Sequence, residues 1–295
     1  SFQLESTERP RCRLAAVLNV SPDHLDRHGT LENYAAAKRR LVEAADPAGT
    51  VTLNAGDAAV RAMAEGAGAP VTWFGRHLDA QAMAAPHSTV EDGWVVLATR
   101  GGRAPVLPVA DIPLFGDHNV DNVLAAAALG DAAGVAAEHI AGAVRGFKAV
   151  AHRLQPVLDA GGVLWVNDSK ATNVDAAATA LRAFDRPIVW IGGGGSKGVG
   201  PEPLAAAVAR YARHAVLNGA SGPELDAALA QLGYRERTLV GDLQGAVLAA
   251  RELARPGDVV LLAPGYTSFD QFSCFEERGD AFAALVGELV AAGTR

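Results

Sequence analysis

The segment Val163-Leu164-Trp165-Val166-Asn167-Asp168-Ser169-Lys170-Ala171-Thr172-Asn173 joins a short apolar run to a polar stretch. The apolar run has the length of a buried strand, and the alanine-rich sequence over 174–183 has the character of a helix. Strand, polar loop and helix in this order form the repeating unit of a parallel sheet, whose ligands lie beyond the carboxyl ends of the strands. The segment therefore predicts an α/β fold with this loop at the ligand-binding edge.

The same order recurs on both sides of this segment. Downstream, we predict strands at 187–191, 215–218 and 259–262, and helices at 204–211, 223–232, 246–253 and 275–291. Upstream, we predict strands at 14–20 and 51–54, helices at 31–45, 58–65, 119–129 and 136–144, and a more antiparallel region with strands at 73–74 and 94–97. Because the alternation of strands and helices starts again after Lys148, we predict two domains, 1–149 and 150–295.

Length and composition agree with two soluble globular domains. The 295 residues are 49% hydrophobic and 20% charged, which is ample for a core. The formal net charge of −7 argues against a nucleic-acid partner. No apolar run reaches the roughly 18 residues of a membrane span, and the N-terminal residues do not resemble an export signal. We therefore expect a cytoplasmic protein without a membrane partner, working as a monomer.

The cysteine and lysine counts limit which kinds of functional site the chain can contain. Cys12 and Cys274 have no partner spacing, which excludes a disulfide framework and a cysteine-rich zinc site. Of the 26 basic residues, 22 are arginine and only four are lysine. The lysines are Lys38, Lys148, Lys170 and Lys197. Where a positive charge alone is enough, the chain uses arginine. The lysines are therefore candidates for tasks that need a compact amine, although codon bias would produce the same count.

Polar segments follow four predicted strands, and three of these segments lie in the second half. They are 21–24, 167–173, 192–198 and 263–268. The glycine loop Gly192–Gly198 follows a strand and precedes a helix, where bare backbone can approach an anion. It is neither a Walker A loop, since Gly198 follows Lys197, nor a clear dinucleotide fingerprint. A plain tight turn remains the alternative.

Three further groups of polar residues each have a structural alternative. His24, flanked by Asp23 and Asp26 and followed by Lys38, could hold a divalent cation, yet a lone loop histidine is more often structural. The sequence His118–Asn122 opens a helix that it can simply cap. Thr172 or Asn173 is expected to cap the helix that begins near Val174.

These residues resemble the Mur ligase family, and within it the members that add D-glutamate. The resemblance covers nearly the whole chain and is most specific at Asp168–Asn173. The other segments that carry it are 1–5, 18–27, 34–38, 118–122, 152–153, 268–272 and 275–279.

The resemblance implies a fold, a reaction and its cofactors. The fold would be a central ATPase domain, with a mostly parallel sheet and a small antiparallel region, followed by a Rossmann-like, doubly wound C-terminal domain. The reaction would join D-glutamate to UDP-N-acetylmuramoyl-L-alanine through an acyl phosphate, using ATP and two Mg²⁺ ions, in peptidoglycan precursor synthesis.

The resemblance also implies roles for individual residues. His24 would be a magnesium ligand and Lys38 a carbamylated lysine beside the second magnesium, with Lys170 at the reacting groups. Nucleotide would be bound by Asn119, Asn122, Arg153 and Asp168. D-glutamate or the transferring phosphate would be held by Lys170, Thr172, Lys197, Ser268 and the backbone of Phe275.

The chain also departs from the family pattern. It contains no Gly-Lys-Thr or Gly-Lys-Ser phosphate loop and no N-terminal UDP-binding domain, so we expect it to be part of a longer enzyme and to be inactive by itself. The alternatives are a catalytically inert Mur-like binding or regulatory module, and a related amide ligase that uses another amino acid. The Mur-like amidotransferases carry a four-cysteine zinc ribbon, which two cysteines cannot supply. A nicotinamide-dependent dehydrogenase is disfavoured by the missing fingerprint.

Overall fold

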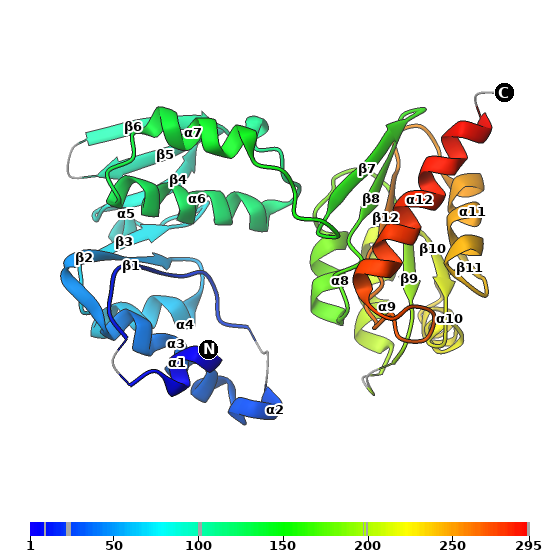
Figure 1. Ribbon diagram of the computed structural model, residues 1–295, viewed down its shortest axis with the longest axis horizontal. Coiled ribbons are helices and arrows are strands. Elements are labelled where there is room, and N and C mark those ends of the chain that lie inside the picture. Colours follow the sequence, from blue (N-terminus) through cyan, green and yellow to red (C-terminus); the bar gives the residue numbers. More distant parts are fainter. Residues whose placement is uncertain (9, 22–24, 100–101, 197, 199, 294–295) are drawn as a thin grey trace. The chain divides into compact units, whose positions relative to one another are not determined.

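The computed structural model describes residues 1–8, 10–21, 25–99, 102–196, 198 and 200–293, which form two compact units (Figure 1). Unit 1 contains Ser1–Pro113 and Asp117–Phe147, and unit 2 contains Leu114–Gly116 and Lys148–Arg295. Each unit is built on its own six-stranded sheet with helices packed against it.

The sheet of unit 1 has its strands in chain order, β1-β2-β3-β4-β5-β6. These are β1 (Cys12–Val17), β2 (Ala45–Asn54), β3 (Val71–Phe74), β4 (His87–Glu91), β5 (Trp94–Thr99) and β6 (Gly102–Pro108). β1 to β4 are parallel, and β4, β5 and β6 are antiparallel to one another. The predicted antiparallel region therefore exists, but placing Trp73-Phe74 in it was wrong. β3 pairs in parallel with both neighbours, and its Trp73 and Phe74 are both buried.

Helices cover both faces of this sheet. They are α1 (Phe2–Ser6), α2 (Leu25–His28), α3 (Leu31–Glu43), α4 (Ala58–Arg61), α5 (Ala80–Met83), α6 (Asp117–Ala132) and α7 (Ala137–Gly146), with 3-10 turns η1 (Ala62–Gly66) and η2 (Val109–Asp111). Val42 of α3, Val60 of α4 and Met63 of η1 share a core with Val51 and Leu53 of β2. α6 packs against β1 to β5. Thr30 starts α3 by accepting a hydrogen bond from the Asn33 amide, as an N-cap residue does.

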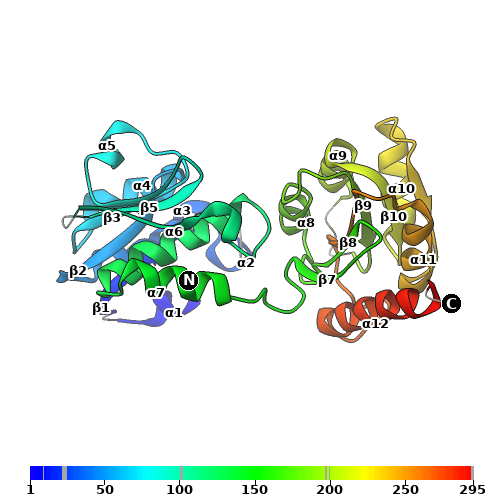
Figure 2. The same ribbon diagram turned by 90° about the horizontal axis from the view of Figure 1, so that it is seen from above.

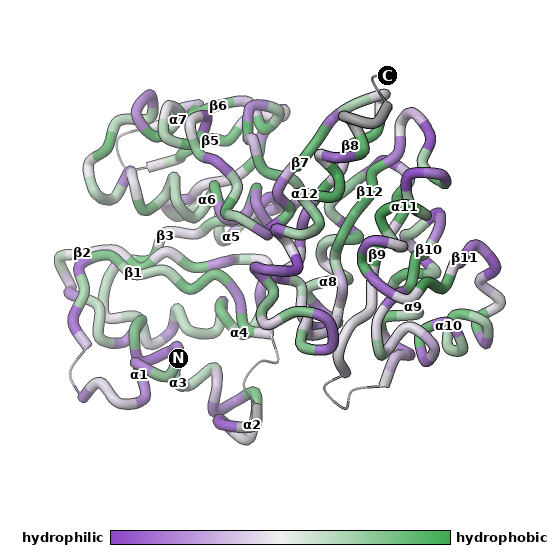
Figure 3. Tube along the Cα trace, turned by 45° about the vertical axis from the view of Figure 1, so that its right-hand side comes forward, coloured by the Kyte–Doolittle hydropathy of each residue, from purple (hydrophilic) through white to green (hydrophobic). Residues whose placement is uncertain are grey.

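The sheet of unit 2 has the order β11-β10-β9-β12-β8-β7. Its strands are β7 (Gln155–Ala160), β8 (Val163–Asn167), β9 (Ile188–Gly193), β10 (Ala212–Asn218), β11 (Arg237–Leu239) and β12 (Val259–Leu262). Only the edge strand β7 is antiparallel to its neighbour. The central strands are continuously apolar because helices cover both of their faces, and Figure 3 shows β12 as hydrophobic along its length.

The two faces of this sheet carry separate cores. The helices of unit 2 are α8 (Val174–Leu181), α9 (Glu202–Tyr211), α10 (Gly222–Gln231), α11 (Leu243–Leu253) and α12 (Phe275–Gly293). Trp190 of β9 packs with α8, α9 and α10, whereas its neighbours Val189 and Ile191 pack with α11 and α12. Figure 2 shows α8 and α9 on one side of the sheet and α12 on the other. The doubly wound architecture predicted for this half is confirmed.

Candidate active site

Three segments of unit 2 meet at the carboxyl edge of its sheet. One is the loop Asp168–Asn173 after β8, the second is Ala263–Ser268 after β12, and the third is the start of α12 at Phe275. The Asp168 amide donates to Leu262 O (2.7 Å), and the Gly265 amide donates to Ala171 O (2.8 Å). The first two segments are therefore joined through their backbones.

The loop after β8 is a tight, hydrogen-bonded turn that ends in a helix cap. The Ala171 amide donates to Asp168 O, and the Thr172 amide donates to Lys170 O. The Asn173 side chain accepts from the Ala176 amide (2.8 Å), which confirms Asn173 as the N-cap of α8. Lys170 is exposed, and its ammonium lies 4.2 Å from the centroid of the Phe275 ring.

A buried arginine on α12 joins all three segments. Arg278 is only 4% exposed. Its guanidinium donates to Ser169 Oγ (3.0 Å), Ser169 O (2.9 Å) and Thr267 O (3.0 Å), with longer bonds to Tyr266 O (3.3 Å). Desolvation lowers the pKa of Arg278 to about 10, and the charge of Asp270 opposes this shift. Five donors in a planar fork suit arginine to this task, which a lysine ammonium could not perform.

The segment before β7 completes the same edge with two residues in left-handed backbone conformations. His152 has φ +61° and Leu154 has φ +40°. The Leu154 amide donates to Asp168 Oδ1 (3.1 Å), and the Lys170 amide donates to His152 O (3.1 Å). Non-glycine residues rarely adopt this conformation, and such strain is common at functional sites.

His152 also fixes this segment onto α12. Its Nδ1 lies 3.1 Å from Asn167 Nδ2, and Asn167 Nδ2 donates to Gly279 O (3.0 Å). A Cβ on Gly279 would lie 2.2 Å from His152 Nδ1, so only glycine allows the imidazole ring to approach α12 this closely. The histidine thus serves packing at this edge, while Arg153 beside it is exposed.

Asp168 is a buried carboxylate, 8% exposed. Burial raises its pKa to about 6, while the hydrogen bond from the Leu154 amide and the nearby Arg153 charge act in the opposite direction. A carboxylate shifted in this way and lying at the ligand edge of a sheet is a functional-site candidate on physical grounds.

An open pocket of about 530 Å³ lies at this edge and is called the Lys170 pocket below. It is lined by Val150, Ala151, His152, Arg153, Lys170, Phe275 and Glu276. The structure therefore brings three predicted residues, Arg153, Lys170 and Phe275, to one pocket. Asp168, Thr172 and Ser268 lie on the same joined loops, and Ser268 is 2% exposed.

The glycine loop has a packing role that its sequence did not reveal. A Cβ on Gly193 would lie 2.0 Å from Asn218 O, and one on Gly194 would lie 2.2 Å from Thr267 O. Gly195 forms an isolated bridge with Thr267. The glycines thus let the end of β9 contact the end of β10 and the loop after β12 closely. Lys197, the predicted ligand in this loop, lies outside the described residues.

In unit 1, Lys38 lies near the carboxyl end of β1. Its ammonium donates to Asn19 O (2.8 Å) and lies 4.5 Å from the centroid of the Tyr34 ring. Asn54, at the end of β2, donates to Leu18 O (2.8 Å), so this edge is also closely joined. His24, predicted as a partner of Lys38, lies outside the described residues.

Asn119 and Asn122 lie in the first two turns of α6, as predicted for a helix that opens at this sequence. Asn122 Nδ2 donates to Asn119 Oδ1 (3.2 Å). Arg76, which follows β3, forms ion pairs with Asp117 and Asp121 on the same turns. The predicted nucleotide residues of unit 1 are therefore near one another, at the end of α6 that attracts anions.

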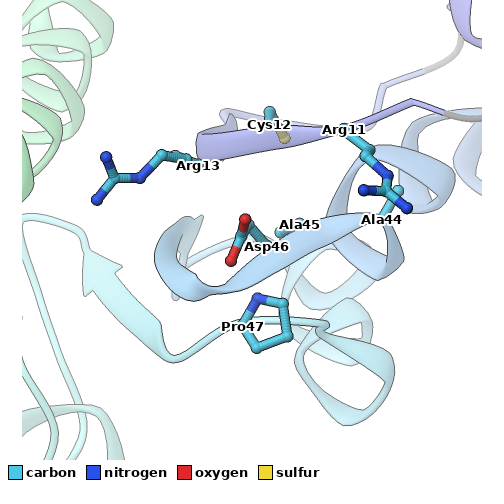
Figure 4. A pocket seen from close by; sticks show the side chains of 7 residues that line it. All are labelled: Arg11, Cys12, Arg13, Ala44, Ala45, Asp46 and Pro47. Carbon is cyan, nitrogen blue, oxygen red and sulfur yellow. The ribbon is translucent and has the colours of Figure 1, made fainter.

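A second pocket, of about 400 Å³, lies at the opposite, amino-terminal edge of the unit 1 sheet. It is lined by Arg11, Cys12, Arg13, Ala44, Ala45, Asp46 and Pro47, and Figure 4 shows the side chains of Arg11 and Arg13 extending to opposite sides. None of the predicted site residues lines it. Because ligands of parallel sheets bind at the carboxyl edge, we assign it no role.

Two features are absent from the part of the chain that the structure describes. No helix there is long and apolar enough to cross a membrane. No group of three or more His, Cys, Asp or Glu side chains there could hold a metal ion.

Sequence reasoning missed Ser169, Tyr266 and Arg278 as parts of this site. Arg278 follows Glu276 and Glu277, and acidic residues are ordinary in the first turn of a helix. Its partner Ser169 stands 109 positions away in the sequence, so no local pattern could have paired them.

Comparison with known proteins agrees with this fold. Residues 3–130 match the Mur ligase middle domain, and residues 152–265 match the Mur ligase, glutamate ligase domain. The chain belongs to the Mur ligase family.

Two curated relatives carry the name UDP-N-acetylmuramoylalanine–D-glutamate ligase. The protein from Pelotomaculum thermopropionicum is 40% identical over 98% of this chain and 63% of its own length. The protein from Acidobacterium capsulatum is 44% identical over 97% of this chain and 61% of its own length. The chain thus spans about three fifths of the length of these relatives.

Solved structures share the fold at lower identity. MurF from Acinetobacter baumannii matches with a TM-score of 0.67 at 21% identity, over 92% of this chain and 60% of its own. MurC from Thermotoga maritima, a UDP-N-acetylmuramate-alanine ligase, matches with a TM-score of 0.65 at 18% identity, over 94% of this chain and 60% of its own. The predicted fold class is confirmed.

Proposed function

We propose that the chain forms the ATP-binding and amino-acid-binding parts of a ligase that joins D-glutamate to UDP-N-acetylmuramoyl-L-alanine. The observation that carries the proposal is the Lys170 pocket, where Lys170, Arg153 and Phe275 come together beside the buried carboxylate of Asp168. The printed names of relatives 40–44% identical support the same reaction. The reaction belongs to peptidoglycan precursor synthesis, a cytoplasmic step in cell wall biogenesis on which cell shape and division depend.

The proposed reaction has two steps in which negative charge gathers at phosphate. The carboxylate of the UDP-linked substrate attacks the γ-phosphorus of ATP, and ADP leaves. The amine of D-glutamate then attacks the acyl carbon, loses a proton, and phosphate leaves. Positioned cations stabilise such transition states because their charges are already oriented before the reaction.

We assign these tasks to the residues at the two sheet edges. Lys170 faces the transferring phosphate, and D-glutamate is held by Thr172, Lys197, Ser268 and the backbone of Phe275. Nucleotide is bound by Asn119 and Asn122 of unit 1 and by Arg153 and Asp168 of unit 2. An ionised Asp168 accepts hydrogen bonds only, which suits a sugar hydroxyl as its partner.

Magnesium fits the residues of unit 1 only in part. The described residues offer no ready cluster of acidic or imidazole ligands. A carbamate on Lys38 would add the oxygen ligands that magnesium prefers. An imidazole such as that of His24, which lies outside the described residues, also suits a divalent cation. When bound, magnesium would neutralise phosphate charge, and we propose Lys38 and His24 as the residues that hold it.

Two alternatives remain distinguishable by experiment. An inert binding module would bind its ligands without turnover, and a related ligase would prefer another amino acid. We therefore propose titrating the 295-residue chain with D-glutamate, L-glutamate and meso-diaminopimelate in an isothermal calorimeter. We expect binding of D-glutamate that is lost in Lys170→Met and kept in Lys148→Met, whose lysine is exposed outside the pocket. Preference for either other amino acid would contradict the proposed substrate.

A further inference from the structure

Ser169 is a fully buried serine, 0% exposed, beside the exposed Lys170. Each of its polar groups has a partner. Its amide donates to Asn167 Oδ1 (3.1 Å), and its carbonyl accepts from Arg278 Nη2 (2.9 Å). Its hydroxyl oxygen accepts from Arg278 Nε (3.0 Å) and lies 2.8 Å from Phe275 O.

The hydroxyl of Ser169 has a defined direction. Arg278 Nε can only donate, so the serine oxygen is the acceptor in that bond. The serine proton is then directed to the other close oxygen, Phe275 O. Because a charged donor polarises the hydroxyl that accepts from it, the bond to Phe275 is strengthened. Ser169 therefore fixes the backbone of the first residue of α12.

The Phe275 side chain connects this bond to the pocket. Its ring lies under the ammonium of Lys170, with 4.2 Å between Lys170 Nζ and the ring centroid. A cation at this distance is attracted by the ring face. The ring also makes an edge-on contact with His152, at 6.2 Å between centroids. The lysine is thus placed by an aromatic surface rather than by a carboxylate.

We propose that Ser169 is a positioning residue, which fixes Phe275 so that the aromatic ring holds the Lys170 ammonium in the pocket. The use of that ammonium for phosphate or D-glutamate rests on the proposed function. The placement of the ammonium does not, and it can be measured on the chain without any ligand.

Because the chain has only four lysines, the position of the Lys170 ammonium can be followed by NMR. In a chain labelled with ¹³C-lysine, each lysine gives one set of ε-methylene signals, assigned by replacing each lysine in turn with arginine. A proton above an aromatic ring is shifted upfield by the ring current. We expect upfield signals for Lys170 and for Lys38, whose ammonium lies 4.5 Å from the Tyr34 centroid, compared with the exposed Lys148.

Ser169→Ala should move the Lys170 signal to the position of Lys148 and leave the Lys38 signal unchanged. Ser88→Ala is the matched control, since Ser88 is also 0% exposed but lies in unit 1. Phe275→Leu keeps the backbone carbonyl that accepts from Ser169 and removes the ring, so it should give the same Lys170 shift even if Ser169→Ala fails to fold. An unshifted Lys170 signal in the parent chain, or one that stays upfield in Ser169→Ala, would overturn the proposal.

A ligand measurement separates this proposal from the proposed function. If both hold, the D-glutamate affinity should fall about tenfold in Ser169→Ala, as expected for losing a buried hydrogen bond, and should not fall in Ser88→Ala. If the parent chain binds no D-glutamate while the lysine signals behave as expected, the proposed function fails and the positioning role stands. Unchanged affinity in Ser169→Ala, with the Lys170 signal moved, would contradict the use of this ammonium for D-glutamate and leave the positioning role standing.

Discussion

At the scale of single residues, the site depends on groups that burial has moved away from their ordinary behaviour. Asp168 is the clearest case, because burial raises its pKa to about 6 from 3.8. Between these two values the folded chain holds a proton on this carboxyl that the unfolded chain has lost. The contribution to stability is therefore present below about pH 4 and is lost as the pH rises through 6.

This linkage predicts that Asp168→Asn changes how stability depends on pH. Between pH 4 and pH 7, the unfolding free energy of the parent chain should fall by up to about 3 kcal/mol more than that of the variant, since one pKa unit corresponds to about 1.4 kcal/mol. Urea unfolding at several pH values measures this. Asp159→Asn, at an exposed aspartate on β7, is the control. Parallel pH curves for Asp168→Asn and the parent chain would refute the raised pKa.

Lys38 gives a second prediction at this scale. In the structure its ammonium donates to Asn19 O, a contact that arginine could also make. A carbamate, by contrast, requires an amine, so Lys38→Arg should abolish ligase activity in the complete enzyme despite keeping the charge. Formate or acetate should partly restore Lys38→Ala. Near-normal turnover by Lys38→Arg would contradict the carbamate role and leave only the hydrogen bond to Asn19 O as the role of Lys38.

At the scale of elements, the site depends on how helices begin beside the strands. Asn173 caps α8 directly after the loop that carries Lys170. Asn173→Ala should lower the unfolding free energy by about 1 kcal/mol, whereas Asn173→Asp should retain the cap. Hydrogen exchange should show faster exchange in the first turn of α8 for the alanine variant. Equal exchange in the two variants would show that the cap does not stabilise this helix.

Arg278 acts on three elements together. Arg278→Met leaves the buried carbonyls of Ser169 and Tyr266 without their donor and removes one of the two donors to Thr267 O, so we expect a loss of about 3 kcal/mol or more. Arg278→Lys should recover little, because one compact ammonium cannot reach all three segments. Arg251→Met, at an exposed arginine of α11, is the control for urea unfolding. A loss no larger than that of Arg251→Met would exclude this joining role.

Burial explains which helices and strands could be predicted from the sequence. β8, β9 and β12 are covered on both faces, so their continuous apolar runs identified them. β4, β6, β7 and β11 were not predicted, because β11 has only three residues and the other three strands have polar residues, glycine or proline among their apolar positions. Asn173 was one of two predicted caps, with Thr172, because a cap acts within three residues of itself. Ser169 and Arg278 were not, because their bonds join residues far apart in the sequence and become visible only when the strands are ordered.

At the scale of the whole molecule, two sheets each carry predicted site residues at their carboxyl edges. The edge of unit 1 carries Lys38, Asn119 and Asn122, and that of unit 2 carries Asp168 and Lys170. The fold of each unit thus explains why residues from distant parts of each half gather at one edge. That these edges serve one ligation reaction is the central claim.

Phosphate release tests this claim most directly. The chain, completed with the parts of the Pelotomaculum thermopropionicum relative outside the matched region, is assayed with ATP, Mg²⁺ and UDP-N-acetylmuramoyl-L-alanine. We predict phosphate release that requires D-glutamate, is lost in Lys170→Met and persists in Lys148→Met. Release that does not depend on D-glutamate, or that survives Lys170→Met unchanged, would contradict the account.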